Sequence, residues 1–416
     1  MDKKRALINI FATLSLFFLF LNDHTVYSVF FDSITSIFTI LSVFFLGICL
    51  LIVRKIYAEV NFYFILFLWS ISVLISCLWY GLTRIVYVRF AYWMLVVLFV
   101  TTIYIANVDF KKILYNVVRI YVIWSLVNYL LNITFLEYLP ITATSSKLLY
   151  NWYNINLYGH LFSKSYTHLT IGNLSILRLD RPFGEPGIAQ MYFNFGFIYA
   201  CFFEKKYKKK IFWIFVFTLG IVLSCSLTGY VIYFVLSMIY FLSINKKTYF
   251  IVFGTIAIIV FLVMLIDKFG TISYEDRSQD LIFMFNTIID NFPLGIGLGN
   301  TSTLKHNVIE STGEVSIGFY CGLLYPFAQF GIFGFIYYYF MFREISHFYI
   351  NKYVCMSFGF FLLITLFTEP QADEPFIMIF IIDSVLKLVE KDDNKIEEEI
   401  ESEENECINN NFLETH

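Results

Sequence analysis

Long apolar runs separated by short polar stretches recur along most of the chain. About twelve of them are long enough to cross a bilayer, since a helical crossing takes roughly 17 to 25 mostly apolar residues. The runs cover approximately residues 6–22, 34–53, 61–80, 90–108, 113–135, 188–203, 211–226, 228–244, 248–266, 319–342, 353–371 and 376–389. The pattern predicts an all-α, polytopic integral membrane protein whose single domain spans residues 1–389.

Only Leu227-Thr-Gly229 separates the seventh run from the eighth, so that a kinked helix and a helical hairpin are both conceivable. Lysines precede the pair in the cluster from Lys205 to Lys210 and follow it at Lys246 and Lys247. Lysine-rich loops gather on one side of a membrane. Both ends of the pair therefore belong on the same side, which favours the hairpin.

The composition also indicates a membrane environment. The chain is 59% apolar, 21% aromatic and 15% charged, with a mean hydropathy of +0.71, whereas about a quarter of the residues of a soluble domain are charged. This balance argues against an ordinary soluble protein. The seven cysteines lie mostly inside apolar runs and lack CxxC spacing. They are interpreted as small buried hydrophobes, with neither a disulfide framework nor a metal site favoured.

The basic residues of the short loops indicate the orientation. If the chain crosses twelve times, they fall on one side, which is then the cytoplasm. These residues are Lys3, Lys4, Arg5, Arg54, Lys55, Lys111, Lys112, the cluster from Lys205 to Lys210, Lys246, Lys247, Arg343 and Lys352. Both termini are thus expected in the cytoplasm, and residues 390–416 form an acidic tail that is expected to be disordered. Arg119, inside the fifth run, is expected to snorkel to the same surface.

Two long loops, about 137–187 and 267–318, face outward in this arrangement. Loops of such length are usually functional or disordered, and these two contain too many apolar side chains for a disordered linker. Residues 278–290 have helical periodicity, with Leu281, Phe285 and Ile288 on one face. This stretch predicts a helix on the membrane surface or over the outer mouth of the bundle.

The segment Arg178-Leu-Asp-Arg181-Pro-Phe-Gly-Glu185-Pro-Gly187 places two guanidiniums and a carboxylate just before a membrane run. Charges are costly there unless they serve a function. Arg178 and Arg181 could form a fork for phosphate or pyrophosphate oxygens, or could contact lipid headgroups. Glu185 could act as a base at the helix entrance, or could simply interact with the helix dipole.

Further candidates lie elsewhere in the outward elements. Arg277 opens the predicted surface helix between two aspartates, where it either binds substrate or forms local ion pairs. His306, in the same loop, could be a base, a donor or a plain surface histidine. Arg89 shares an outer turn with Arg84 and is a candidate substrate contact, although interfacial snorkelling is the default interpretation of both.

These features together resemble the Wzy-type polymerases of O-antigen and capsular polysaccharide repeat units, in the O-antigen polymerase and ligase superfamily. The likeness covers nearly the whole chain as a GT-C-like architecture with two large extracytoplasmic loops. Four local stretches carry it: Arg181-Pro-Phe-Gly-Glu185-Pro186, Ser226-Leu-Thr-Gly229, Asn291-Phe-Pro-Leu-Gly-Ile-Gly-Leu-Gly299 and Phe330-Gly-Ile-Phe-Gly334. They are similar to the family's Glu-Pro helix entry, Ser/Thr-Gly hairpin, Pro-Leu-Gly-x-Gly loop and glycine-spaced late helix.

The chain departs from that family in two places. His306-Asn307 is similar to the histidine of the ligase branch, but the following Gly318 and Gly322 do not fit that branch's pattern. Polymerase loops often carry an arginine with a glycine eleven residues later, and neither Arg181 nor Arg277 has one. These departures leave open which role each arginine has.

The resemblance implies an enzyme of the bacterial inner membrane that needs no nucleotide, metal or other cofactor. It would transfer a growing glycan from undecaprenyl pyrophosphate to a sugar hydroxyl of a lipid-linked repeat unit. The implied partners are these glycolipids, membrane lipid and a chain-length regulator protein, and no nucleic acid. The implied site residues are Arg181, Arg277 and Arg178 for the pyrophosphate, Glu185 or His306 for the base, and Trp152 and Tyr153 for stacking on sugars.

Two other functions remain open from the sequence. An O-antigen ligase, joining glycan to lipid A core, would use the same type of donor. A lipid-linked oligosaccharide flippase or transporter is expected to place charges inside several membrane runs, whereas the charges here cluster in the outward loops. This distribution favours an enzyme.

Overall fold

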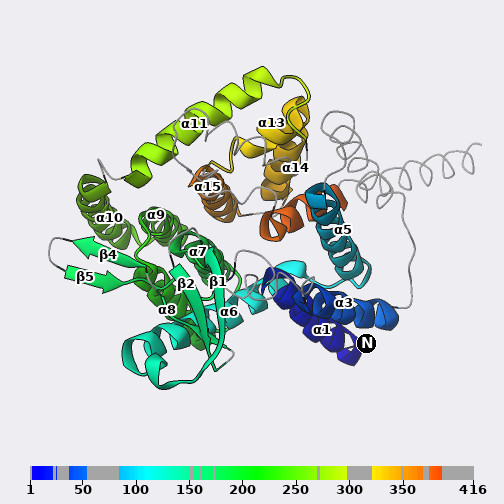
Figure 1. Ribbon diagram of the computed structural model, residues 1–416, viewed down its shortest axis with the longest axis horizontal. Helices are drawn as coiled ribbons and strands as arrows, with labels where there is room; N and C mark the ends of the chain where they lie inside the picture. Colours follow the sequence, from blue (N-terminus) through cyan, green and yellow to red (C-terminus); the bar gives the residue numbers. More distant parts are fainter. Residues whose placement is uncertain are drawn as a thin grey trace, which may run out of the picture.

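A computed structural model describes residues 2–21, 25, 37–53, 84–149, 153–159, 161–165, 167–171, 174–268, 272–297, 321–347, 351–368 and 374–386 (Figure 1). Helices make up most of this part of the chain, as the sequence predicts. They are α1 (Asp2–Leu21), α3 (Ile37–Val53), α5 (Arg84–Ile105), α6 (Phe110–Thr134), α7 (Pro186–Phe202), α8 (Tyr207–Ser224), α9 (Leu227–Ser243), α10 (Lys247–Lys268), α11 (Ile272–Asp290), α13 (Tyr325–Phe330), α14 (Gly334–His347) and α15 (Lys352–Thr368). A last helix covers Pro375–Leu386, and single 3-10 turns cover Leu136–Tyr138 and Gly331–Phe333.

The predicted apolar runs correspond to these helices, apart from two cases. Run 61–80 lies outside the described residues, as does the acidic tail 390–416. Run 319–342 was predicted as one helix, but the structure divides it into α13, a 3-10 turn and α14. Gly331 ends α13 with a φ of 56° and a ψ of -126°, which an α-helix does not accommodate.

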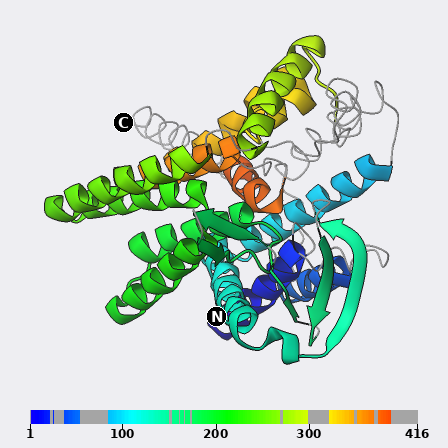
Figure 2. The same ribbon diagram turned by 60° about the vertical axis from the view of Figure 1, so that its left-hand side comes forward.

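Two helices of the described part are both long and apolar enough to cross a membrane, Lys3–Leu21 and Phe110–Thr134. Shorter apolar helices of 10–17 residues accompany them: Ile37–Val53, Phe90–Ile105, Leu227–Ser243, Leu281–Asp290, Lys352–Thr368 and Pro375–Leu386. The two longer helices are compatible with association with a membrane. In both overall views α1 and α3 lie side by side (Figures 1 and 2).

The loop of residues 137–187 contains strands, which the all-α prediction did not anticipate. They are β1 (Ile141–Leu149), β2 (Tyr153–Tyr158), β3 (Phe162–Ser163), β4 (His168–Ile171) and β5 (Leu174–Leu177). The first three form an antiparallel sheet in the order β1-β2-β3, and β4 pairs with β5 as a second antiparallel sheet. The loop is therefore folded, which agrees with its many apolar residues.

Helix α7 is the centre of the described core. Almost every one of its residues is buried, including Gln190 and Asn194, and a helix that is apolar all round needs protein on every side. It contacts α6, α8, α9 and α15. The ring of Phe195 also meets Phe376 and Phe380 of the last helix edge-on, with centroids 5.5 and 6.0 Å away. This burial fixes the position of the segment that enters α7.

The hairpin predicted at Leu227-Thr-Gly229 is confirmed. Helix α8 ends at Cys225, which has left-handed backbone geometry (φ 48°), and Ser226 caps α9 by accepting a hydrogen bond from the Gly229 N–H at 3.4 Å. Gly229 packs directly on the side chain of Gln190, because a Cβ at this glycine would lie only 2.8 Å from the Cβ of Gln190. The hairpin is thus seated against the first turns of α7.

The two glycine-rich motifs contact each other. The N–H groups of Ile296 and Gly297 donate to the carbonyls of Ala328 and Gln329, and the N–H of Ile332 donates to the carbonyl of Pro293, each at 2.8 Å. The backbone of the Pro-Leu-Gly-Ile-Gly turn therefore pairs with the interruption between α13 and α14. Helix α11 precedes this turn and reaches from α10 towards α13 (Figure 1).

Helix α11 begins earlier than predicted, and its buried face differs from the predicted one. Met284 is fully buried and Ile288 is partly buried, whereas Phe285 is 57% exposed. The exposed apolar positions recur at Ile282, Phe285 and Ile289, on the other side of the helix. The periodicity was sufficient to predict the helix but not which of its faces is buried.

Replacing Gly331 by alanine is expected to destabilise the junction of the two motifs. A Cβ at Gly331 would collide with the carbonyl oxygen of Pro293, and its φ of +56° is strained for other residues. We expect the free energy of unfolding to fall by at least about 2 kcal/mol, measured as the thermal midpoint of the detergent-purified protein. Gly47→Ala is the control, because a Cβ there meets nothing within 4 Å. Equal midpoints for the two variants would contradict this packing.

Candidate functional site

The segment between β5 and α7 passes through the interior of the protein. Leu179, Asp180, Arg181 and Phe183 are all buried, with exposed fractions of 5% or less. The N–H of Leu179 donates to the carbonyl of Leu223 at the end of α8, at 2.8 Å. Contact with lipid headgroups, one of the two interpretations from the sequence, therefore does not describe Arg181.

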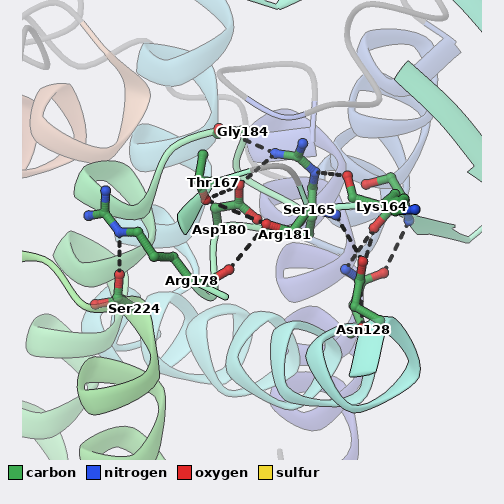
Figure 3. Close-up of polar contacts among 11 residues, drawn as sticks. Asn128, Lys164, Ser165, Thr167, Arg178, Asp180, Arg181, Gly184 and Ser224 are labelled. Atoms are coloured by element: carbon green, nitrogen blue, oxygen red, sulfur yellow. Dashed lines mark hydrogen bonds and ion pairs between the residues drawn. The ribbon is translucent and has the colours of Figure 1, made fainter. Parts of the chain in front are cut away.

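Arg181 is held by three groups of its own loop region (Figure 3). Its Nη1 forms an ion pair with Oδ2 of Asp180 at 3.1 Å and donates to the carbonyl of Gly184 at 3.3 Å. Its Nε donates to the carbonyl of Lys164, also at 3.1 Å. Through these contacts one guanidinium connects the turn before α7 to the strand region of the loop 137–187.

The carboxylate of Asp180 is fully buried and has a second partner. The hydroxyl of Thr167 donates to its Oδ2 at 2.8 Å, while Oδ1 is buried without a hydrogen-bond partner in the described part of the chain. A buried charge is costly unless it is paired, and removing one partner of a buried pair typically costs about 3 to 5 kcal/mol. The pair is thus a strong constraint on the local geometry.

Two asparagines of α6 hold the strand region beneath the pair. Asn128 exchanges two hydrogen bonds with the backbone of Ser163, each at 3.1 Å, and the Oδ1 of Asn132 accepts from the N–H of Ser165 at 2.9 Å. The Ser165 hydroxyl then donates to the carbonyl of Arg178 at 3.2 Å. Residues 163–165 therefore link α6 to the charged segment through hydrogen bonds.

Arg178 is placed differently from Arg181. Its Nε donates to the carbonyl of Ser224 at 3.1 Å, at the turn between α8 and α9, and no hydrogen bond or ion pair joins its terminal nitrogens to the described residues. Figure 3 shows its guanidinium beside Ser224, apart from that of Arg181. Arg178 is half-buried. A fork in which both arginines grip the same oxygen stays a prediction, since each has its own partners here.

The electrostatic surroundings of Arg178 are mixed. Burial lowers the pKa of its guanidinium, and the nearby Cys225, Asp180 and Glu185 act in the opposite direction. The ordinary pKa of arginine lies above about 12, so the group remains cationic at neutral pH. Arg178 is consequently a cation whose two terminal nitrogens can donate hydrogen bonds to an anionic ligand.

Glu185 occupies the position before the first turn of α7. Its backbone is extended (φ -130°, ψ 139°), its carbonyl accepts from the Ala189 N–H at 3.1 Å, and its half-buried side chain makes no capping hydrogen bond to the helix. Gly184, with a φ of +80°, provides the bend before it. The carboxylate lies within electrostatic reach of Arg178, so an acid–base group and a cation share the entrance to α7.

The other predicted site residues are placed only in part. Arg277 lies in α11, Arg89 in α5 and Tyr153 at the start of β2, and for these three the described structure is limited to the backbone. Trp152 and His306 lie outside the described residues. The structure therefore brings together Arg178, Arg181 and Glu185, and the contribution of the remaining candidates stays a prediction.

Sequence reasoning missed Asp180 and its supporting residues. Asp180 stands between the two arginines in the printed segment, and a carboxylate beside arginines was a signal for a buried ion pair. Asn128 and Asn132 are four positions apart in an otherwise apolar run, which puts them on one helix face. Such polar residues in an apolar helix indicate buried hydrogen bonding.

The entrance to α7 can bind an anion and exchange a proton, which are two elements of group transfer.

No group of three or more His, Cys, Asp or Glu side chains in the described part of the chain is arranged to hold a metal ion. No protein-family model matches the chain, and no curated protein or solved structure matches it significantly. The chemistry of the site is thus inferred from its own residues.

Asp180→Asn is expected to destabilise the protein. The substitution keeps the shape but leaves the Arg181 guanidinium buried without its counter-charge, so the free energy of unfolding should fall by about 3 kcal/mol. Thermal unfolding in detergent measures the change. Asp290→Asn is the matched control, because Asp290 is exposed at the end of α11. A midpoint like that of the control would show that the ion pair does not hold this segment.

Proposed function

We propose that the protein polymerises oligosaccharide repeat units linked to undecaprenyl pyrophosphate, by glycosyl transfer on the outer face of the bacterial cytoplasmic membrane. In this proposal about twelve transmembrane helices carry the site, and both termini are cytoplasmic. The observation that supports it most directly is the presence of two groups at the entrance to α7. One is Arg178, whose terminal nitrogens lack partners among the described residues, and the other is the carboxylate of Glu185, which lies within electrostatic reach of it.

The placement of charge along the helices supports an outward-facing site. Helix α6 begins beside Lys111 and Lys112 and carries Asn128 and Asn132, which hold the site region, near its other end. Helix α7 likewise runs from Glu185 towards the lysine cluster that starts at Lys205. Basic loops favour the cytoplasmic side. The charged segment at the opposite ends of these helices then faces outward, where lipid-linked repeat units are polymerised in this proposal.

In the proposed reaction the acceptor hydroxyl attacks the anomeric carbon of the growing glycan. A new glycosidic C–O bond forms as the bond from that carbon to the phosphate oxygen breaks, and lipid pyrophosphate leaves with the bonding electrons. Arg178 binds the departing phosphate and stabilises its growing negative charge. Glu185 takes the proton of the hydroxyl. Arg181 and Asp180 hold the segment so that Arg178 and Glu185 keep their relative positions.

Arg178→Gln is expected to abolish long glycan chains. Losing one donor to a developing oxyanion typically lowers the rate by on the order of 10²- to 10³-fold, so cells carrying the variant should show short chains or single repeat units on a gel, at normal membrane levels of the protein. Arg5→Gln, at an exposed position of α1, is the control. A normal ladder in the Arg178 variant would reject the role of this arginine, and loss of single repeat units as well would indicate a ligase instead.

Glu185→Gln tests the base. The amide keeps the size of the side chain but cannot take the proton, and loss of a general base typically lowers the rate by about 10²- to 10⁴-fold. The measurement is polymer formed per unit time by purified protein with a lipid-linked repeat unit. Glu204→Gln serves as control, since this glutamate is also half-buried but follows the far end of α7. Full activity of the Glu185 variant would leave its carboxylate with a structural part only.

A further inference from the structure

A second arginine-containing site lies at the other end of α6. The guanidinium of Arg119 lies over the indole of Trp213 in α8, with its carbon 4.0 Å from the ring centroid, and 5.4 Å from the ring of Tyr115. The sequence predicts that this side chain snorkels towards the membrane surface. The structure instead shows Arg119 half-buried between α6 and α8.

The guanidinium of Arg119 is short of acceptors. Its Nη1 donates to Oδ1 of Asn116 at 3.4 Å, and its Nε is buried without a partner among the described residues. A cation on an aromatic face is stabilised by the ring quadrupole, but the ring supplies no hydrogen-bond acceptor. A buried donor left unpaired costs free energy. An anionic ligand at this position would accept from the second terminal nitrogen, for which no hydrogen bond to the described residues is found.

Two lysines lie on the same helix faces, closer to the ends of their helices. Lys112 precedes Arg119 by seven residues on α6, and Lys209 precedes Trp213 by four on α8, spacings that place each pair on one face. Both lysines are exposed. Lys210 points elsewhere, with its Nζ 5.0 Å from the ring of Tyr240. The two helices thus present three cations along the seam between them.

Acidic side chains at this end do not offset these cations. Asp109 uses its carboxylate to cap α6, accepting from the N–H groups of Lys111 and Lys112 at 3.0 and 3.4 Å. Glu204 is half-buried near Tyr115 and Tyr199. The lysines of the neighbouring turns outnumber these two carboxylates, so the local charge is positive.

The seam continues into an apolar surface. Ile123 of α6, four residues after Arg119, is 46% exposed, and Phe212 of α8, three residues after Lys209, is 54% exposed. These residues follow the cations in the direction of the middle of both helices. A free phosphate would use only the cations, whereas a lipid would also cover the apolar side chains.

We propose that the seam between α6 and α8 binds an anionic phospholipid of the cytoplasmic leaflet. Its phosphate contacts Arg119, with Lys112 and Lys209 beside the headgroup, and its acyl chains lie over Ile123 and Phe212. Basic sites between membrane helices on the cytoplasmic side are suited to such lipids. The inference rests on the membrane orientation given under the proposed function, but not on the glycosyl transfer.

The test titrates the full-length purified protein in detergent with brominated phosphatidylglycerol, and with brominated phosphatidylcholine in a parallel arm. Bromine on the acyl chains quenches tryptophan fluorescence. The part of the quenching that is lost in Trp213→Phe comes from Trp213 and therefore reports binding at the seam. We expect phosphatidylglycerol to bind at least about tenfold more tightly than phosphatidylcholine. The double variant Lys112→Gln/Lys209→Gln, made at exposed positions, should reduce this preference to below about threefold. Arg119→Gln should do the same.

The matched control is Lys246→Gln/Lys247→Gln, which removes the same charge at the same end of the bundle, between α9 and α10. It should keep the preference. Equal quenching by the two lipids, or an equal loss in both double variants, would overturn the site. Inhibition of the phosphatidylglycerol signal by millimolar inorganic phosphate alone would show a phosphate site and not a lipid site. If a membrane-impermeant thiol reagent labelled the cysteine of Lys247→Cys from outside intact cells, this end of the helices could not be cytoplasmic. That result would not depend on the lipid affinities.

Discussion

The buried ion pair between Asp180 and Arg181 is the interaction on which the rest of the site depends. It lies between the strand-containing loop 137–187 and the entrance to the central helix α7. Its partners come from both sides: Lys164 and Thr167 from the loop, and Gly184 from the turn. An exposed pair would contribute little. Because this pair is buried, any shift of the loop relative to α7 would leave a charge uncompensated.

This constraint separates the tasks of the charged residues. Arg181 uses its Nε and Nη1 on the protein itself, whereas Arg178 bonds the protein through Nε alone. A cation that is positioned by neighbours but not saturated by them can stabilise charge that appears only during a reaction. The buried arginine is thus better suited to positioning and the half-buried one to binding. The same helices that carry this segment at one end carry lysines at the other, which gives the bundle a consistent polarity.

The helices could be predicted from the sequence because apolar periodicity and length are local properties. The hairpin at Gly229 could be predicted as well, since lysines on both sides of the pair report the orientation. The strands β1 to β5 were missed for two reasons: three of them have only two to four residues, and the alternation of Tyr153, Ile155 and Leu157 with Asn154 and Asn156 in β2 was overlooked. The break at Gly331 was missed because it depends on the carbonyl of Pro293, about forty residues earlier in the chain.

The different roles of Arg178 and Arg181 could not be predicted from the sequence either, because they depend on which carbonyls surround each guanidinium.

The most direct test is the binding of a short prenyl pyrophosphate to the purified protein, followed by phosphorus-31 NMR. The account predicts saturable binding that weakens by at least about tenfold in Arg178→Gln and is unchanged in Arg5→Gln. Equal affinity of the wild-type protein and the Arg178 variant would contradict it.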